Sequence, residues 1–271
     1  MESTALAEPP VAVDPLVSLR GVHQVFARRG RTVAALAGVD LAIEAGEFVS
    51  LLGPSGCGKS TLLRIIGGLQ APVRGEVVVA GSSAAAARAA KQYGLVPQAP
   101  ALVPWKTVAD NVRFLSGLHR NRRTAHRPLD DAAIAGLLDA VGLTGFEKSY
   151  PHELSGGMQQ RVSLVRAFAL GAPILLMDEP FAALDEITRA DMRYLLLELW
   201  ERARSTVVFV THSVAEAAIL SDRVMVMAAR PGRIAAERTI GLPRPRTPAM
   251  EDDPAFHEVV RVLRGDLREH H

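Results

Sequence analysis

Apolar residues follow two alternating patterns along the chain. FVSLLG, APILLMDEP and STVVFVTHS contain continuous apolar runs, which are typical of strands buried on both faces of a sheet. RADMRYLLLELWERAR instead places Met192, Leu195, Leu196 and Leu199 at the spacing of one helix face. Because strand and helix patterns alternate, the sequence predicts a parallel sheet with an inserted helical subdomain. Ligands of such sheets bind at the carboxyl ends of the strands.

The first third of the chain is rich in strand patterns. LVSLRGVHQVF predicts a strand, and VAALAGVDLAIEAGEFVSLLG is interpreted as another that closes on the buried run. A helix should begin inside GKSTLLRIIGGL and stop at the pair Gly67 and Gly68. RGEVVVAG predicts a strand that ends at Gly81. SSAAAARAAKQ fits a short helix or a linker, and a surface connection is the preferred interpretation.

The patterns also predict where the parts of the chain begin and end. Residues 1–16 should form a loose tail, because acids and prolines stand where a signal peptide needs a basic start and an apolar stretch. The main domain should span residues 17–240, with the helical subdomain at about residues 107–165. Its basic stretch HRNRRTAHRPLDD is interpreted as a solvated loop. Residues 241–271 form an extension with a helix around FHEVVRVLRGDL, which should pack on the core or regulate it, packing being preferred.

Composition narrows the class of protein. A chain of 271 residues that is 48% hydrophobic can bury a sizeable core. Its formal net charge of +2 gives no reason to expect a nucleic-acid partner. The single cysteine excludes an internal disulfide and fits a reducing compartment. His212, Glu216 and Asp222 interrupt the most apolar window before it reaches the roughly 20 residues of a membrane span. We therefore expect a soluble protein that could still dock on a membrane protein.

A glycine-rich loop supplies the first chemical motif. GPSGCGKST lies between a strand pattern and a helix pattern, as the phosphate-binding motif G-x-x-x-x-G-K-[ST] requires. Its backbone amides and the helix N-terminus can surround phosphates. We expect Lys59 to reach the β- and γ-phosphates and Ser60 to ligate Mg²⁺. The predicted nucleotide-binding residues here are Gly53, Pro54, Ser55, Gly56, Cys57, Gly58, Lys59, Ser60 and Thr61.

Cys57 lies inside this loop, close to the start of the helix. A helix N-terminus can lower the pKa of a thiol. The preferred interpretation is a small filler, but the position also predicts that a bulky maleimide would attack Cys57 and abolish nucleotide binding.

Polar residues at the ends of two other strands can act on a bound phosphate. ILLMDEP carries Asp178 and Glu179, which point to opposite sides if strand alternation persists. One carboxylate could then hold the Mg²⁺ shell while the other faces the attacking water. His212 ends the next apolar strand, where a lone histidine is more often structural. Gln98 is equally ambiguous alone, since its amide could ligate Mg²⁺ or orient water.

LSGGMQQR adds a second glycine motif that precedes a helix pattern. Ser155 and the amides of Gly156 and Gly157 have the chemistry of another phosphate clamp. A flexible serine-glycine turn fits poorly with the helix-prone residues that follow. The sequence thus contains two candidate clamps for one kind of ligand.

Together these motifs resemble the ATP-binding cassette (ABC) ATPases over about residues 17–240. GPSGCGKST is similar to the Walker A motif, ILLMDEP to Walker B with its catalytic glutamate, and LSGGMQQR to the family signature. Gln98 is similar to the Q-loop glutamine, Asp185 in AALD to the D-loop, and His212 to the switch histidine. The resemblance implies a P-loop NTPase domain of ABC type, with a mixed sheet core, an antiparallel β edge and an inserted helical subdomain.

The resemblance also implies why two clamps occur in one chain. In this family the signature of one nucleotide domain faces the ATP held by Walker A of another, so a head-to-tail homodimer with two sandwiched ATP molecules is expected. The residues implied to act across that interface are Ser155, Gly156, Gly157, Gln159 and Asp185.

Roles within one chain follow from the same resemblance. Glu179 would polarise the attacking water, and Lys59, His212 and Gln98 would complete the catalytic set. Phe26 takes the position of the aromatic residue that stacks on adenine, where the family commonly has tyrosine, although core packing is an alternative. The implied cofactors are ATP and Mg²⁺, the latter bound by Ser60, Gln98 and Asp178.

Three further segments resemble one importer group. PALVPWKTVADNV, YPHELSGGMQQR and ARPGRI with LPRPR are similar to the nitrate, sulfonate and taurine group of bacterial importers, which also serves pyrimidine precursors of thiamine. The implied partners are integral membrane permease subunits and, indirectly, an extracytoplasmic substrate-binding protein. The implied location is peripheral, at the cytoplasmic face of the inner membrane. LPRPR could alternatively be only a proline-rich edge segment.

Other classes of ABC ATPase remain as alternatives. The chain could serve an exporter. A soluble cassette that acts on nucleic acid or the ribosome would usually show a coiled-coil insertion or tandem cassettes, and neither pattern occurs here. A cassette that only binds nucleotide would lack Glu179 or His212, which are both present.

Overall fold

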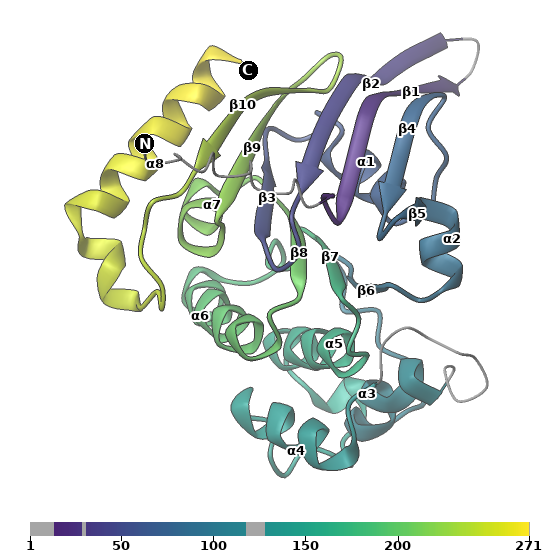
Figure 1. Ribbon diagram of the computed structural model, residues 1–271. Coiled ribbons are helices and arrows are strands. Elements are labelled where there is room, and N and C mark those ends of the chain that lie inside the picture. Colours follow the sequence, from purple (N-terminus) through teal and green to yellow (C-terminus); the bar gives the residue numbers. More distant parts are fainter. Residues whose placement is uncertain (1–13, 29–30, 118–127, 271) are drawn as a thin grey trace, which may run out of the picture.

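A computed structural model of the chain describes residues 14–28, 31–117 and 128–270 (Figure 1). Within them, the larger sheet has six strands in the order β10-β9-β3-β8-β7-β6. The five strands from β9 to β6 run parallel, and β10 is antiparallel to β9. These strands are β3 (Phe48–Leu52), β6 (Tyr93–Val96), β7 (Ile174–Asp178), β8 (Thr206–Thr211), β9 (Arg223–Ala228) and β10 (Arg233–Thr239).

A smaller antiparallel sheet covers the start of the chain, with strands in the order β2-β1-β4-β5. The segment interpreted as one strand up to residue 53 is two strands in two different sheets, so that interpretation was wrong. Gly46, at φ 80°, makes a turn between them, and the continuous apolar run that follows is buried in the larger sheet. The strands are β1 (Val17–Arg28), β2 (Arg31–Ile43), β4 (Arg74–Val79) and β5 (Ser82–Ser83).

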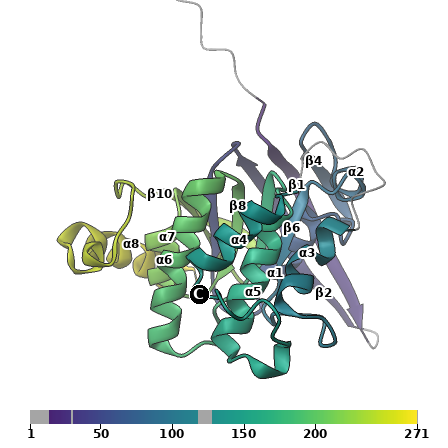
Figure 2. The same cartoon turned by 90° about the horizontal axis from the view of Figure 1, so that it is seen from below.

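Helices cover the sheets and form a separate group at one end of the molecule. In Figures 1 and 2, α3 and α4 lie beside α5 at the end away from the smaller sheet. The helix after the phosphate loop ends at Gly67, as the glycine pair predicts. The helices are α1 (Lys59–Ile66), α2 (Ala84–Ala89), α3 (Val108–Gly117), α4 (Asp131–Ala140), α5 (Gly156–Ala169), α6 (Glu186–Ala203), α7 (Val214–Leu220) and α8 (Pro254–Glu269), with 3-10 turns at Pro151–Glu153 and Pro248–Asp252.

The alanine-rich segment after β5 corrects an expectation. It forms helix α2 and not the preferred surface connection. Ser83 caps the helix by accepting a hydrogen bond from the backbone N–H of Ala86 at 3.3 Å, and Ala84 and Ala87 are buried. A serine cap followed by alanines favours a helix locally, which explains the outcome. The prediction of a loose tail concerns residues 1–16, most of which lie outside the described residues. Most of the basic stretch 119–131 lies outside them too.

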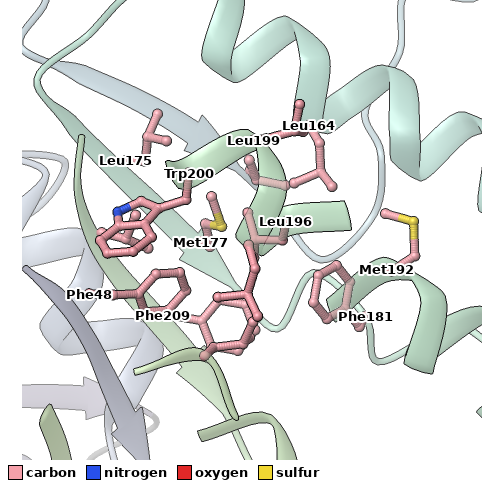
Figure 3. Packing of buried hydrophobic residues seen from close by; sticks show 14 of the residues in the cluster. Phe48, Leu164, Leu175, Met177, Phe181, Met192, Leu196, Leu199, Trp200 and Phe209 are labelled. Carbon is pink, nitrogen blue, oxygen red and sulfur yellow. The ribbon is translucent and has the colours of Figure 1, made fainter. Parts of the chain in front are cut away.

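Aromatic side chains connect the larger sheet to α6 (Figure 3). The rings of Phe48, on β3, and Trp200, on α6, pack edge to face with their centroids 5.7 Å apart. The ring centroid of Phe209, on the adjacent strand β8, lies 5.8 Å from that of Phe48. Phe181, in the loop after β7, continues this cluster at 5.7 Å from Phe209. Burial of such large rings is a strong driving force for folding. The loop that follows β7 is therefore anchored directly to the core.

The chain after β10 folds back onto the core. Arg246 donates to the carbonyls of Ile219 and Ser221 at 2.9 and 2.8 Å, which satisfies acceptors at the end of α7. Arg244 lies over the Trp200 ring at 4.1 Å from its centroid. LPRPR is thus fixed by its arginines and is more than an extended edge. Helix α8 adds three buried side chains to the main core, namely Phe256, Val260 and Leu263.

Among the described residues, no helix combines the length and the apolar character that crossing a bilayer requires.

Candidate functional site

The phosphate loop joins the end of β3 to the start of α1. Gly58 adopts φ 100°, and a Cβ there would lie 2.7 Å from the Leu36 side chain and 2.9 Å from the Ala35 carbonyl. Only glycine fits this combination of left-handed backbone and close packing. The sequence GxxxxGKS therefore folds into a tight loop whose backbone is held against β2.

Lys59 is buried at the first position of α1, with 4% of its surface exposed. Its Nζ donates hydrogen bonds to the carbonyls of Gly53 at 2.7 Å and Pro54 at 2.9 Å. An ammonium group has three donors, and the third faces Sγ of Cys57 at 4.0 Å. The Oε1 atom of Glu179 lies 3.8 Å from the same Nζ. The loop thus holds a positive charge in place, next to a carboxylate.

Ser60 and Asp178 meet at the head of α1. The Ser60 hydroxyl donates to Oδ1 of Asp178 at 2.6 Å, so the end of β7 lies directly against the phosphate loop. Mg²⁺ prefers oxygen ligands and is usually held by one or two carboxylates together with substrate phosphates. A serine hydroxyl and a carboxylate beside a phosphate loop fit that requirement. Within the described residues, no group of three or more acidic, histidine or cysteine side chains is arranged so that it could hold a metal ion.

Glu179 begins a sharp turn after β7. Its φ of 45° is left-handed, which is uncommon for a residue with a side chain and costs roughly 1–3 kcal/mol. Its backbone N–H donates to the Val210 carbonyl at 3.0 Å, which fixes the turn against β8. Oε2 lies 3.0 Å from Nδ1 of His212. Asp178 and Glu179 therefore face different partners, because the backbone turns between them and not because strand alternation continues.

A pocket of about 450 Å³ opens in front of the phosphate loop. Its lining includes Phe26, which is 43% exposed, together with Lys59, Ser60, Thr61 and Glu179. The exposed ring of Phe26 is more consistent with a ligand contact than with core packing. Asp178 and His212 join the pocket indirectly through Ser60 and Glu179.

Several lining residues were missed in the sequence. Arg230 and Gly232 reach the pocket from the turn between β9 and β10, and the remaining ones lie in β2: Val33, Ala34 and Ala35. The Gly232 N–H donates to the Ala35 carbonyl at 3.0 Å, and a Cβ on Gly232 would lie 2.2 Å from the Cys57 carbonyl. RPG in the sequence signals a turn but not its place beside the phosphate loop.

Cys57 behaves differently from the reactive thiol considered above. Its side chain is 1% exposed, and this burial raises the pKa of the thiol, an effect that the nearby Lys59 only partly opposes. A buried thiol with a raised pKa is a poor nucleophile. The structure therefore supports the filler interpretation, and ready maleimide attack on the folded chain is no longer expected.

The second glycine motif lines a pocket of its own, of about 370 Å³. Ser155 caps α5 by accepting from the Met158 N–H at 3.3 Å, and Gly156 and Gly157 form the first turn. Asp185 lies on the opposite wall and caps α6, where hydrogen bonds from Thr188 lower the pKa of its carboxyl. None of the residues that line this pocket also lines the pocket of the phosphate loop. One chain therefore presents two separate pockets, each lined by a glycine motif.

Seven predicted site residues line neither pocket: Gly53, Pro54, Cys57, Gln98, Asp178, Gln159 and His212. The side-chain amide of Gln159 donates to the carbonyls of Pro151 and Leu154 at 2.9 and 3.3 Å, which braces the turn that carries Ser155. Gln98 follows β6 and is exposed. It does not line the pocket of the phosphate loop.

Comparison with known proteins agrees with the motif order and the pockets. Residues 36–182 match the ABC transporter family. The chain belongs to this family. An uncharacterized ABC transporter ATP-binding protein of Methanocaldococcus jannaschii is 45% identical over 233 residues, covering 85% of this chain and 84% of the relative. An aliphatic sulfonates import ATP-binding protein of Bacillus cereus is 40% identical over 247 residues, covering 90% and 92%. The resemblance to the importer group that includes sulfonate systems is thereby confirmed.

A solved ABC structure shows the same architecture. A dimeric structure of a post-hydrolysis state of an ATP-binding cassette, bound to ADP and phosphate, matches with a TM-score of 0.70 and 33% identity. The match covers 83% of this chain and 98% of that chain. The predicted fold class, a mixed α/β core with an antiparallel β sheet and added helices, is confirmed. Membership in an ABC ATPase family implies nucleotide binding and ATP hydrolysis.

Proposed function

We propose that the chain is the ATP-hydrolysing subunit of a bacterial importer and that it works as a head-to-tail homodimer on a separate membrane permease. The observation that carries this proposal is the division of the phosphate-binding groups between two pockets of one chain. A phosphate loop with a buried lysine lines one pocket, and a serine-capped helix N-terminus lines the other. Each nucleotide then needs the first pocket of one chain and the second pocket of its partner.

Within one chain, the first pocket binds and orients the nucleotide. Phe26 stacks on the adenine, and the backbone amides of residues 55–61 surround the phosphates. Lys59, which its two carbonyl bonds hold in place, neutralises charge on the β- and γ-phosphates. Ser60 and Asp178 would hold Mg²⁺, which when bound adds positive charge beside the same phosphates. Gln98 would supply a further oxygen ligand to the same ion.

Glu179 and His212 act on the water molecule that attacks the γ-phosphate. The Glu179 carboxylate lies between Lys59 and His212, at 3.8 and 3.0 Å, where it can accept a proton from a water molecule aligned with the γ-phosphate. His212 is exposed and can turn from Glu179 to a phosphate oxygen when ATP binds. In this assignment Glu179 is the general base, and His212 holds the phosphate and the water in line.

The second pocket completes the site of the partner. Ser155, Gly156 and Gly157 line a pocket that is open to a ligand from outside the chain. The positive end of the α5 dipole adds to their attraction for a γ-phosphate. Asp185 on the facing wall would contact the partner and couple the two sites. Hydrolysis removes the phosphate that both halves share and should release the dimer.

An apolar groove supports docking on a permease. It has a volume of about 370 Å³ and lies between the end of α1, β6 and α3, with Arg88 and Lys91 at its rim. Gln98 follows β6 only three residues after Leu95, which lines the groove. We assign the groove to a short cytoplasmic helix of the permease that has an apolar face and acidic residues. Its apolar lining residues are Leu69, Tyr93, Leu95, Leu115, Leu170 and Leu176.

The importer assignment rests on relatives named as aliphatic sulfonates import ATP-binding proteins. It places the chain at the cytoplasmic face of the inner membrane, with an extracytoplasmic substrate-binding protein as an indirect partner. The proposed cargo is a sulfonate, nitrate or taurine-like anion or a pyrimidine precursor of thiamine. Replacing Leu69, which is exposed in the groove, by Arg should abolish co-purification with the permease while the isolated chain still hydrolyses ATP. Unchanged co-purification would refute this docking site.

The decisive experiment is the mass of a Glu179→Gln variant, measured by light scattering with and without Mg-ATP. Glutamine removes the base but leaves Lys59, Ser155 and the backbone amides, so ATP should stay bound and the mass should double. Glu179→Gln/Ser155→Arg is the matched control and should remain monomeric while it still binds ATP. A Glu179→Gln chain that stays monomeric at saturating ATP would contradict the shared site.

A further inference from the structure

A buried carboxylate lies directly behind His212. Glu216 is on the first turn of α7 and is 5% exposed. Its Oε2 accepts a hydrogen bond from the Thr211 hydroxyl at 2.5 Å, and that hydroxyl accepts one from the Ser213 N–H at 2.9 Å. Both neighbours of His212 in the chain are thus held by this one arrangement. The short loop that carries His212 has little freedom to move while these bonds persist.

The other oxygen of Glu216 faces a different loop. Its Oε1 lies 4.0 Å from Nε of Arg189, on α6. Arg189 in turn donates to the carbonyls of Phe181 at 3.3 Å and Leu184 at 2.7 Å. These carbonyls belong to the segment between Glu179 and Asp185. Glu216 is therefore connected through one arginine to the loop that ends at the second pocket.

The buried charge of Glu216 opposes independent movement of the two loops. A buried carboxylate is costly unless it is paired and hydrogen-bonded, so Glu216 favours positions of both loops that keep its partners. Burial raises the pKa of its carboxyl, whereas the Thr211 hydrogen bond and the charges of Arg189, Arg193 and His212 oppose that shift. If either loop moved alone, one oxygen of Glu216 would lose its partner.

We propose that Glu216 is a positioning residue that fixes the loop of His212 relative to the loop of Asp185. This inference rests on the proposed function, because it concerns how two loops of the same site move together. His212 serves the nucleotide of its own chain, and Asp185 lies at the surface that meets the partner. Through Glu216, docking of the partner against Asp185 sets the position of His212. Glu216 itself does not line the pocket of the phosphate loop.

The Glu216→Gln variant tests this role in steady-state ATP hydrolysis. Glutamine keeps the shape but removes the charge that faces Arg189, so kcat should fall by up to about 100-fold through loss of alignment. The KM and the Kd for ATP should not change, because Phe26 and Lys59 are untouched. A purely structural role would instead lower stability and leave kcat per folded chain as it was.

Thr211 provides a second, independent test. Thr211→Val is nearly isosteric, removes the hydroxyl and should lower kcat like Glu216→Gln, whereas Thr211→Ser keeps the hydroxyl and should restore it. The double variant Thr211→Val/Glu216→Gln should lose no more than the larger of the two single effects, since both break one link. Independent, multiplying effects would overturn the proposal, and so would a folded Glu216→Gln chain with wild-type kcat.

Asp266→Asn is the matched control. Asp266 is also a buried acid that pairs with an arginine, Arg238 at 2.7 Å, but it lies on α8, away from both pockets. We expect a lower unfolding temperature and an unchanged kcat. A wild-type chain that does not hydrolyse ATP would refute the proposed function itself, whereas an active wild type with an equally active Glu216→Gln refutes only the link.

Discussion

The two glycine motifs each lie at the start of a helix, but they form very different sites. At α1, Lys59 is buried and hydrogen-bonded to two carbonyls. Ser60 is hydrogen-bonded to Asp178, and Gly58 packs against β2. At α5, by contrast, Ser155 and Gly156 are exposed, and Arg161, which also lines this pocket, donates a hydrogen bond to the Val141 carbonyl at 3.0 Å. In the proposed function, the first site holds the triphosphate within one chain. The donors of the second site would act only on a phosphate that another chain brings.

The largest effect should come from removing the charge of the first pocket. Lys59→Met leaves the γ-phosphate without its nearest cation, so kcat should fall by about 10²- to 10³-fold, and ATP should bind more weakly. Binding is measured by titration with a fluorescent ATP analogue and turnover by phosphate release. If Lys59→Met bound and hydrolysed ATP normally, the contrast between the two pockets would disappear.

An effect of similar size on turnover, but not on binding, should follow from Ser155→Arg. Its side chain would fill the second pocket, so hydrolysis should be lost while the monomer keeps its affinity for ATP. Mixing Ser155→Arg with Lys59→Met chains should restore activity, because a mixed dimer contains one intact composite site. No recovery on mixing would show that the two pockets do not cooperate across a dimer.

A change far from both pockets should affect stability alone. Leu263→Ala on α8 leaves a cavity in the main core, which should lower the free energy of unfolding by about 2–4 kcal/mol. Urea unfolding measures this loss, and the ATP affinity of the folded chain should be unchanged. A large loss of ATP affinity would mean that α8 supports the first pocket.

The smallest effect should come from the rim of the first pocket. Arg230 lines it with a backbone φ of 56°, in the left-handed region. Arg230→Ala should weaken ATP binding by up to about fivefold, the range of an exposed charge pair. Arg233→Ala is the matched control, since Arg233 is exposed in β10 but does not line the pocket. Equal losses for both variants would point to general charge and not to a contact at Arg230.

The sequence predicted those parts of the site that depend on local patterns. The phosphate loop and the strand ends at Asp178 and His212 were found because each is a short motif in a fixed order. Arg230 and Gly232 were missed because only the packing of the β9–β10 turn against β2 brings them to the pocket. Glu216 was noted only as a break in an apolar run, since its partners lie on β8 and α6.

The same distinction explains the errors in the fold. Residues 33–53 read as one strand because both halves have strand patterns, and the turn at Gly46 is a single residue in a long β-rich segment. Their assignment to different sheets depends on contacts with β1 and β8, which are far apart in the sequence. The assignment of α2 required weighing a serine cap against an alanine-rich composition, which is compatible with several structures.

After β10 the chain folds back over α7 and Trp200, so the hydrophobic core continues beyond the residues that match the family. The family match ends at residue 182, and the motifs end with His212, yet the main core includes Leu242, Phe256 and Leu263. A truncation at residue 240 would remove the arginines that satisfy the end of α7 and would expose one wall of the core. The hydrophobic core therefore extends to α8, well beyond Gly232, the last residue that lines the pocket of the phosphate loop.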